Sequence, residues 1–283
     1  MNIFLTDHKC GSNLISKLVT CINEVIYPLE KAEEINSLNP QNPKFIPRYI
    51  NKKFFSLNKF YKTTKFFFSN ASLVRYFYLF WQDYNIFNKY ILCIRDPREI
   101  IISGYLYHKQ CHEIWAIDNK YNYYSGWKEN HFRKNDINKN KQYFDFCNLF
   151  SKDIPYKEKL LQLDIQDGII YEMNNVAYLT LTGMSKLNFV TKKNVFIFKL
   201  EDFTLNYKET MQKLLDFLKI EENKKKEIYD RIFKFNLTNS KSNKLNIITN
   251  TNLAKDRYKD FFTNKIDNIF KDKYSDLLKK YNY

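Results

Sequence analysis

Short apolar runs along the chain alternate with segments whose apolar positions recur at helical spacing. Residues 2–5, 90–94 and 195–198 are apolar runs of strand length, and the second is apolar at almost every position. Such a run is typical of a strand covered on both faces of a parallel sheet. Residues 12–25 follow the first run and have the helical spacing of Leu14, Ile15, Leu18, Val19, Ile22 and Val25. This alternation predicts an α/β fold around a parallel, doubly wound sheet.

Further elements follow from the same patterns. Residues 65–69 are a candidate strand. Asp96 and Pro97 provide a helix start after the second apolar run, with Asp96 as the N-cap and Pro97 in the first position, and this helix is expected to reach about residue 109. Residues 207–218 have a strongly amphipathic helical pattern.

A helical pattern also begins after Pro155. We expect Asp167 and Gly168 to break it before another helix over residues 169–182, because Asp-Gly pairs are typical of turns.

The composition favours one packed domain over residues 1–283. The chain is long enough to bury a sizeable core. Aromatic residues make up 18% of it, whereas there are only 5 Gly and 6 Pro, which is unlike a disordered or linker-rich protein. Two polar stretches, at about 27–65 and 111–152, are expected to be variable excursions from this domain.

The formal net charge is +15. A basic balance of this size is compatible with nucleic-acid binding. However, Lys and Asn are spread through all polar segments without an Arg-rich stripe or a nucleic-acid-binding module, so a solvated basic surface is the favoured interpretation and a nucleic-acid partner is not expected. A polyanionic co-substrate would also be attracted by this field.

The 5 cysteines are odd in number and have neither a CxxC nor a zinc-ligand spacing. We therefore expect free thiols, a reducing compartment and no metal site. The first apolar run begins directly after Met1, which predicts no cleaved signal peptide, and no apolar run is long enough to cross a bilayer. The expectation is a soluble, cytoplasmic protein with no membrane span.

Candidate chemistry begins in the turn after the first strand. Lys9, Cys10, Gly11, Ser12 and Asn13 lie between the strand and a helix, where backbone N–H groups and a hydroxyl can hold phosphate-like oxygens beside the Lys9 ammonium. The complete Walker pattern is absent because Lys9 precedes Gly11. An ATPase or kinase is therefore disfavoured.

A second cation follows the second strand. Arg95 lies at the carboxyl end of that strand, where ligands of open α/β sheets bind, and Ser103 lies eight residues further along the predicted helix. A guanidinium can bind two phosphate oxygens, and a hydroxyl can add a third contact. The alternative is structural: Arg95 pairs with Asp96 or Glu99, and Ser103 only occupies the helix.

These two segments resemble sulfotransferases. The sequence KCGSN at 9–13 is similar to the phosphosulfate-binding loop of that family, and IRDPREIIISGY at 94–105 is similar to its second motif, in which an Arg and a Ser eight residues later bind the 3′-phosphate of the donor. Lower-specificity similarity continues in order through FIFKLEDF at 196–203 and YKDFFT at 258–263. Only two regions, at about residues 27–65 and 111–152, have no similarity to the family.

The resemblance implies a three-layer α/β/α, P-loop NTPase-like fold. It implies transfer of a sulfuryl group from 3′-phosphoadenosine 5′-phosphosulfate to a hydroxyl or amine of a small-molecule or carbohydrate acceptor, with no metal. Lys9 would stabilise the leaving phosphate, residues 9–13 would bind the phosphosulfate end, and Arg95 with Ser103 would bind the 3′-phosphate. The late phosphate-binding motif of the family is not recognisable; Lys255, Arg257 and Lys259 are its candidate replacements or are solvated charges.

The general base does not follow from the resemblance, because Ser69 to Ser72 stand where cytosolic members carry their histidine. His112 is the preferred candidate. His108 would share a helix face with it if the helix continued, Glu113 is adjacent, and Glu172 is the main rival because carboxylate bases occur among relatives that act on sugars. A surface or structural role is the alternative for each of them.

Two other functions remain as alternatives. One is a nucleotide-dependent phosphotransferase of similar fold, which would need magnesium. The other is a non-catalytic, basic nucleic-acid-binding protein. Its affinity for nucleic acid would survive Lys9→Ala and Arg95→Ala and would fall steeply as the salt concentration rises.

Overall fold

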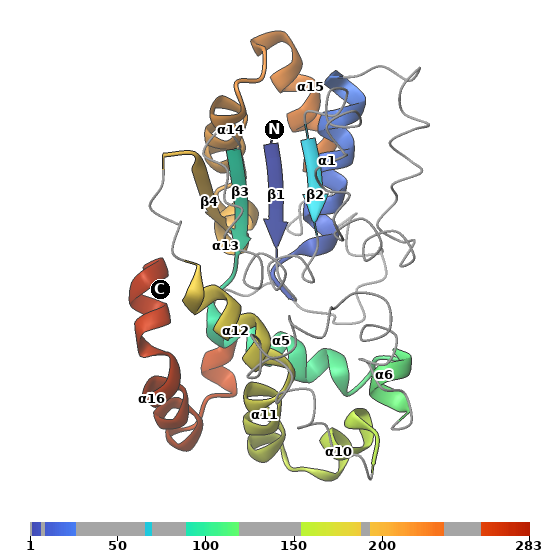
Figure 1. Ribbon diagram of the computed structural model, residues 1–283, viewed down its shortest axis with the longest axis vertical. Helices are drawn as coiled ribbons and strands as arrows, with labels where there is room; N and C mark the ends of the chain where they lie inside the picture. Colours follow the sequence, from blue (N-terminus) through green and yellow to red (C-terminus); the bar gives the residue numbers. More distant parts are fainter. Residues whose placement is uncertain are drawn as a thin grey trace, which may run out of the picture. The chain divides into compact units, whose positions relative to one another are not determined.

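The computed structural model describes residues 2–6, 9–26, 66–69, 89–118, 154–187, 193–234 and 256–283 (Figure 1). The chain divides into two compact units. The first comprises Met1–Asn42, Phe55–Asp96 and Lys186–Lys255, and the second comprises Pro43–Phe54, Pro97–Ser185 and Asp256–Tyr283. The excursion predicted at 27–65 lies outside the described residues, as does most of the one predicted at 111–152.

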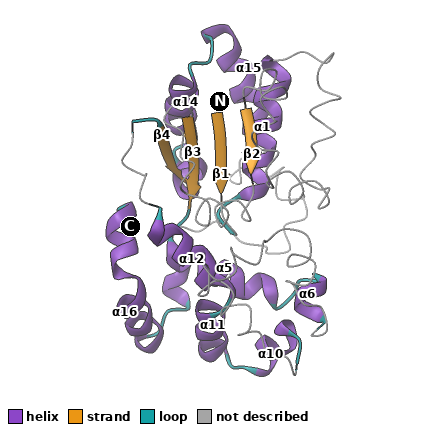
Figure 2. Cartoon of the chain, viewed as in Figure 1, coloured by secondary structure: helices purple, strands orange, loops and turns teal. Residues whose placement is uncertain are grey.

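The first unit contains a four-stranded parallel sheet. Its strands are β1 (Asn2–Thr6), β2 (Phe66–Ser69), β3 (Lys89–Ile94) and β4 (Val195–Lys199), and their order is β2-β1-β3-β4 (Figure 2). The predicted α/β class with a central parallel sheet is confirmed. Each strand also matches its predicted range to within one residue at either end.

The strand order places a topological switch beside β1. The chain moves from β1 to β2 on one side and then returns past β1 to β3 on the other. Thr6 at the end of β1 is in register with Cys93 near the end of β3. The carboxyl ends of these two strands therefore lie side by side, which is where open α/β sheets bind ligands (Figure 1).

Helices of the first unit share one apolar core with the sheet. They are α1 (Ser12–Ile26), α13 (Leu200–Leu205), α14 (Tyr207–Leu218) and α15 (Glu222–Phe233). Phe4, Ile91 and Phe198 contribute the sheet side of this core, and the apolar faces of the four helices contribute the rest. The predicted range of α14 is confirmed residue for residue.

The second unit consists of helices in the part of the chain that is described. These are α5 (Pro97–His108), α6 (Ile114–Ile117), α10 (Tyr156–Gln162), α11 (Ile165–Asn174), α12 (Val176–Lys186), the 3₁₀ helix η5 (Arg257–Asp260) and α16 (Asn264–Tyr281). Helix α5 begins at Pro97 as predicted. No described helix is both apolar enough and long enough to cross a bilayer.

The predicted break at Asp167 and Gly168 is wrong, because both residues lie inside α11. The helix begins instead after Asp164, whose side chain caps it by accepting a hydrogen bond from the N–H of Asp167 at 2.8 Å. Gly168 has a packing role: a Cβ there would lie 2.6 Å from Cε2 of Tyr105 on α5. Gly104 has the reciprocal role, since its Cβ would lie 2.4 Å from Oε1 of Glu172. The two glycines let α5 and α11 approach closely.

Candidate functional site

The turn after β1 has an unusual backbone. Lys9 has φ +62° and Gly11 has φ +87°, both in the left-handed region that only glycine adopts without strain. Gly11 is also tightly confined, because a Cβ there would lie 2.8 Å from Cδ1 of the buried Leu200. Helix α1 then begins at Ser12, and the carbonyl of Gly11 accepts from the N–H of Ile15 at 3.0 Å. The sequence correctly places this turn between strand and helix.

The amides of the first turn of α1, including those of Ser12 and Asn13, cannot bond within the helix. They carry the partial positive charge of a helix N-terminus. The side chains of Ser12 and Asn13 lie outside the described part of the structure, so the predicted contact of the Ser12 hydroxyl stays a prediction.

Side chains at the ends of β1 and β3 hold the carbonyl groups of this turn. Arg95 donates from Nη1 to the carbonyl of Lys9 at 3.2 Å. Thr6 Oγ1 and Cys93 Sγ both donate to the carbonyl of Cys10, each at 3.0 Å. Thr6, Cys10, Cys93 and Arg95 are all buried. The structure thus brings the two predicted cation-bearing segments together at the switch point of the first unit.

The turn after β3 is also fixed within the first unit. The N–H of Asp96 donates to Oε1 of Glu201 on α13 at 3.0 Å. Glu201 belongs to the acidic pair that follows β4. Glu201 therefore fixes the backbone directly after Arg95.

Ser103 lies on α5 in the second unit and is buried. Arg95 belongs to the first unit. Their shared contact with one phosphate stays a prediction. Glu99, considered above as a partner of Arg95, is bound within the second unit: its Oε1 accepts from the N–H of Tyr258 at 2.7 Å and its Oε2 lies 3.3 Å from Nη2 of Arg257.

Two of the candidate bases form one buried network. His108 Nδ1 lies 2.9 Å from Oε2 of Glu172, and both side chains are fully buried. The same carboxylate oxygen accepts from the hydroxyl of Tyr156 at 2.7 Å. Burial, together with the charge of Glu172, raises the pKa of Tyr156 well above its ordinary value, so this hydroxyl stays protonated and donates. The network joins α5, α10 and α11.

The other two candidates lie just after α5. The helix ends at His108, so His112 does not share a helix face with it, and His112 is exposed. Glu113 accepts a hydrogen bond from the hydroxyl of Tyr107 at 2.7 Å. Burial, and then this bond, raise the pKa of Tyr107. Among the four candidates, His112 is the most exposed, Glu113 is partly buried, and His108 and Glu172 are buried.

The sequence matches a family model described as a sulfotransferase domain over residues 3–281, nearly the whole chain and both compact units. The chain belongs to the sulfotransferase family. It is accordingly a transferase of sulfuryl groups, and the resemblance stated from the sequence is confirmed. A comparison with curated proteins gives no match.

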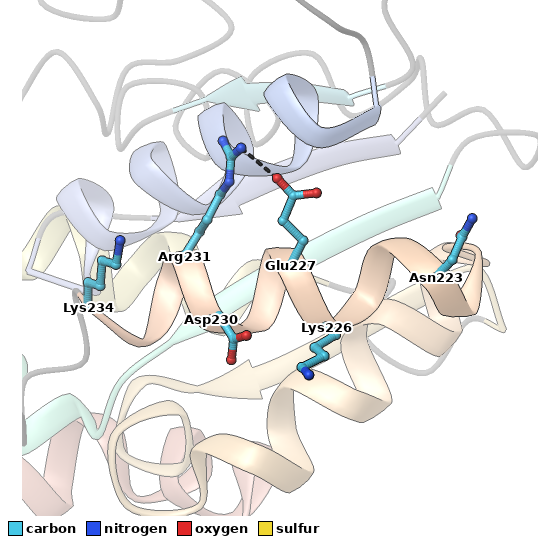
Figure 3. A pocket seen from close by; sticks show the side chains of 6 residues that line it. All are labelled: Asn223, Lys226, Glu227, Asp230, Arg231 and Lys234. Carbon is cyan, nitrogen blue, oxygen red and sulfur yellow. Dashed lines mark hydrogen bonds and ion pairs between the residues drawn. The ribbon is translucent and has the colours of Figure 1, made fainter.

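The sulfotransferase has a hollow of about 350 Å³ along α15 of the first unit. Asn223, Lys226, Glu227, Asp230, Arg231 and Lys234 line it (Figure 3). Arg231 pairs there with Glu227 at 2.5 Å and with Glu24 of α1 at 3.3 Å. Because acidic and basic residues are mixed on this helix, it does not form a purely basic stripe of the kind that binds nucleic acid.

The sequence of this sulfotransferase did not indicate that Thr6 and Cys93 support the turn after β1. A threonine at a strand end and a cysteine in an apolar run both resemble ordinary core residues. Only the register of β1 and β3 shows that their donors meet at one carbonyl. Within the described residues, no group of three or more His, Cys, Asp or Glu could hold a metal ion.

Proposed function

We propose that this sulfotransferase uses 3′-phosphoadenosine 5′-phosphosulfate as its donor and a hydroxyl or amine of a small-molecule or carbohydrate acceptor as its second substrate. The observation that carries the proposal is the hydrogen bond from Arg95 to the carbonyl of Lys9, which joins two cation-bearing turns at adjacent strand ends. The donor has negative charge at two separated positions. Two cations and a row of amides suit such a ligand.

The chemistry follows from where charge develops. The acceptor oxygen or nitrogen forms a bond to sulfur while the bond from sulfur to the bridging phosphate oxygen breaks. Negative charge grows on that oxygen, and Lys9 with the amides of the turn would stabilise it in the transition state. Removing one such donor typically costs roughly 3 kcal/mol of barrier. The products are the sulfated acceptor and adenosine 3′,5′-bisphosphate.

The acceptor also loses a proton, and we assign its removal to His112. This imidazole is exposed in the turn after α5. By contrast, His108 and Glu172 are fully buried and bind one another, which suits a structural role better than contact with an acceptor. Ser103 is assigned to the 3′-phosphate together with Arg95.

The cysteines support a reducing compartment such as the cytoplasm. Cys21 and Cys93 are buried thiols outside any disulfide. Buried thiols without disulfide partners suit a compartment in which cysteines are kept reduced.

Calorimetry with adenosine 3′,5′-bisphosphate in the presence of a chelator tests the donor assignment. We expect wild-type binding at micromolar to millimolar concentration that does not need metal and is weakened by Arg95→Ala. Failure to bind at millimolar concentration, or binding unaffected by Arg95→Ala, would overturn the assignment. ATP with Mg²⁺ serves as the comparison ligand, because a phosphotransferase would prefer it.

A further inference from the structure

Two successive carbonyl groups of the turn after β1 point toward the strands that support it. The carbonyl of Lys9 accepts from Arg95, and the carbonyl of Cys10 accepts from both Thr6 and Cys93. All three donors belong to the carboxyl ends of β1 and β3 or follow them directly. The side of the turn that faces the strands is therefore occupied by carbonyl oxygens.

Peptide planarity determines where the N–H groups of the same peptides point. In a trans peptide the C=O of one residue and the N–H of the next point in opposite directions. Because the carbonyls of Lys9 and Cys10 face the strand donors, the N–H groups of Cys10 and Gly11 face the other way. The left-handed conformations of Lys9 and Gly11 are compatible with such a concave row of amides, which binds anions. The first-turn amides of α1 follow directly in the chain.

We propose that Thr6 and Cys93 are positioning residues of the donor loop, defined here as residues 9–13. By holding the carbonyl of Cys10, they turn the peptide that joins Cys10 to Gly11 so that its N–H faces the 5′-phosphosulfate end of the donor. This inference rests on the donor assignment made above. Neither residue touches the donor; both act through the backbone of the loop.

The residue types suit this role. A carbonyl oxygen has two lone pairs, and it accepts one hydroxyl and one thiol here, each at 3.0 Å. Thr6 and Cys93 are paired in the parallel register of β1 and β3, so both side chains reach the same carbonyl from adjacent strands. Burial, with smaller contributions from Cys10 and Glu201 and an opposing one from Arg95, raises the pKa of Cys93 well above its ordinary value. The thiol consequently keeps the proton that it donates.

The test uses the full-length double variant Thr6→Val with Cys93→Ala and two ligands. Adenosine 3′,5′-bisphosphate carries the 5′-phosphate that the loop would bind, and adenosine 3′-phosphate lacks it. We expect the double variant to bind the bisphosphate at least about tenfold more weakly while its affinity for adenosine 3′-phosphate changes less than about twofold. A general loss of folded structure would instead lower the affinities for both ligands to the same extent.

Two further variants complete the experiment. Thr6→Val combined with Cys93→Ser restores one donor to the Cys10 carbonyl and should recover most of the bisphosphate affinity. Cys21→Ala is the matched control, because Cys21 is a buried cysteine of the same unit whose thiol faces Ile228 in the core. It should leave both affinities unchanged.

The possible results separate the two proposals. If wild type binds the bisphosphate and the double variant binds both ligands as well as wild type does, the positioning role is overturned and the donor assignment stands. An equal loss for both ligands, or no recovery with Cys93→Ser, overturns the positioning role in the same way. If wild type itself fails to bind the bisphosphate, the donor assignment is overturned, and the positioning role with it.

Discussion

Arg95 donates a hydrogen bond from Nη1 to the main-chain carbonyl of Lys9 at 3.2 Å, although the two residues are 86 positions apart in the chain. The guanidinium that is proposed to bind the 3′-phosphate therefore also supports the loop proposed to bind the phosphosulfate. A single side chain would couple the two ends of the donor site. Arg95 is therefore proposed both to contact a phosphate and to support the loop.

Arg95→Ala should weaken both ends of the donor site. We expect the affinity for adenosine 3′,5′-bisphosphate to fall about 100-fold, because a charged phosphate contact and a loop anchor are lost together. The affinity for adenosine 5′-phosphate should fall too, by about tenfold, although that ligand has no 3′-phosphate. Competition binding measures both values.

Arg98→Ala is the control for this change. Its guanidinium stacks 3.8 Å from the centre of the Tyr258 ring, and both residues belong to the second unit. It should leave the affinity for adenosine 5′-phosphate unchanged. If Arg95→Ala reduces only bisphosphate binding, the coupling between the two ends is refuted.

Lys9 combines the charge that is proposed to act in transfer with a left-handed backbone conformation. Lys9→Ala and Lys9→Gly both remove the ammonium, and each should slow sulfuryl transfer by about 100-fold or more. They should differ in stability. The φ of +62° favours glycine, so Lys9→Gly should be more stable than Lys9→Ala. We expect its free energy of unfolding to be higher by about 0.5–1 kcal/mol.

Urea unfolding and release of adenosine 3′,5′-bisphosphate from the donor measure these two effects. Lys219 provides the matched control, because it has φ +60° at the exposed end of α14. Lys219→Gly should stabilise the protein relative to Lys219→Ala by a similar amount and should not slow transfer. Transfer at the wild-type rate in Lys9→Gly would contradict the role of the ammonium.

His112 can be tested through the pH dependence of transfer. An imidazole accepts a proton only when it is neutral, so the wild-type rate should fall toward acidic pH. His112→Asn should be slower and should lose this acid-side fall. Glu113→Gln is the comparison. If that carboxylate were the base, Glu113→Gln rather than His112→Asn would remove the decrease of the rate toward acidic pH. An unchanged profile in His112→Asn would exclude this residue.

The elements predicted from the sequence are those whose own residues decide their structure. Strands β3 and β4, which pair with one another, are apolar over most of their length. Helix α14 buries one regular face. All three elements were therefore predictable from the local sequence pattern. The positions of Lys9 and Arg95 at strand ends followed from the same patterns. A parallel sheet then places such ends at one edge.

Other features depend on contacts between distant segments. Gly168 resembled a helix breaker, but it lies inside α11, where the missing Cβ leaves the space that Tyr105 occupies. Helix α15 was not predicted, since its sequence is mostly charged and only Ile228 and Ile232 are buried. A carbonyl that two side chains share across two strands leaves no periodic signal in a sequence.

The single domain over residues 1–283 stays a prediction, and it requires the two compact units to unfold together. We therefore expect one cooperative unfolding transition in urea. Leu214 lies in the core of the first unit and Leu277 is buried in the second. Leu214→Ala and Leu277→Ala should each shift the whole transition by about 2–5 kcal/mol. Separate transitions, each shifted by only one variant, would show that the units unfold independently.

Substitution of Glu172 shows whether this carboxylate has a structural or a catalytic role. It is fully buried, it binds His108 and Tyr156 through Oε2, and its Oε1 has no hydrogen-bond partner in the described structure. Glu172→Gln places a neutral amide in this network, and we expect the free energy of unfolding to fall by about 2–3 kcal/mol. Transfer per folded molecule should stay within about threefold of wild type, because proton removal is assigned elsewhere.

Glu158→Gln provides the control for Glu172→Gln. Glu158 is exposed on α10, so this change should alter stability by less than about 0.5 kcal/mol. Chemical unfolding and transfer assays on the folded fraction give the two measurements. A Glu172→Gln protein that kept wild-type stability but lost transfer would identify this carboxylate as the base and displace His112. The same network would then have to open toward the acceptor, because a fully buried carboxylate cannot take a proton from a substrate that it does not reach.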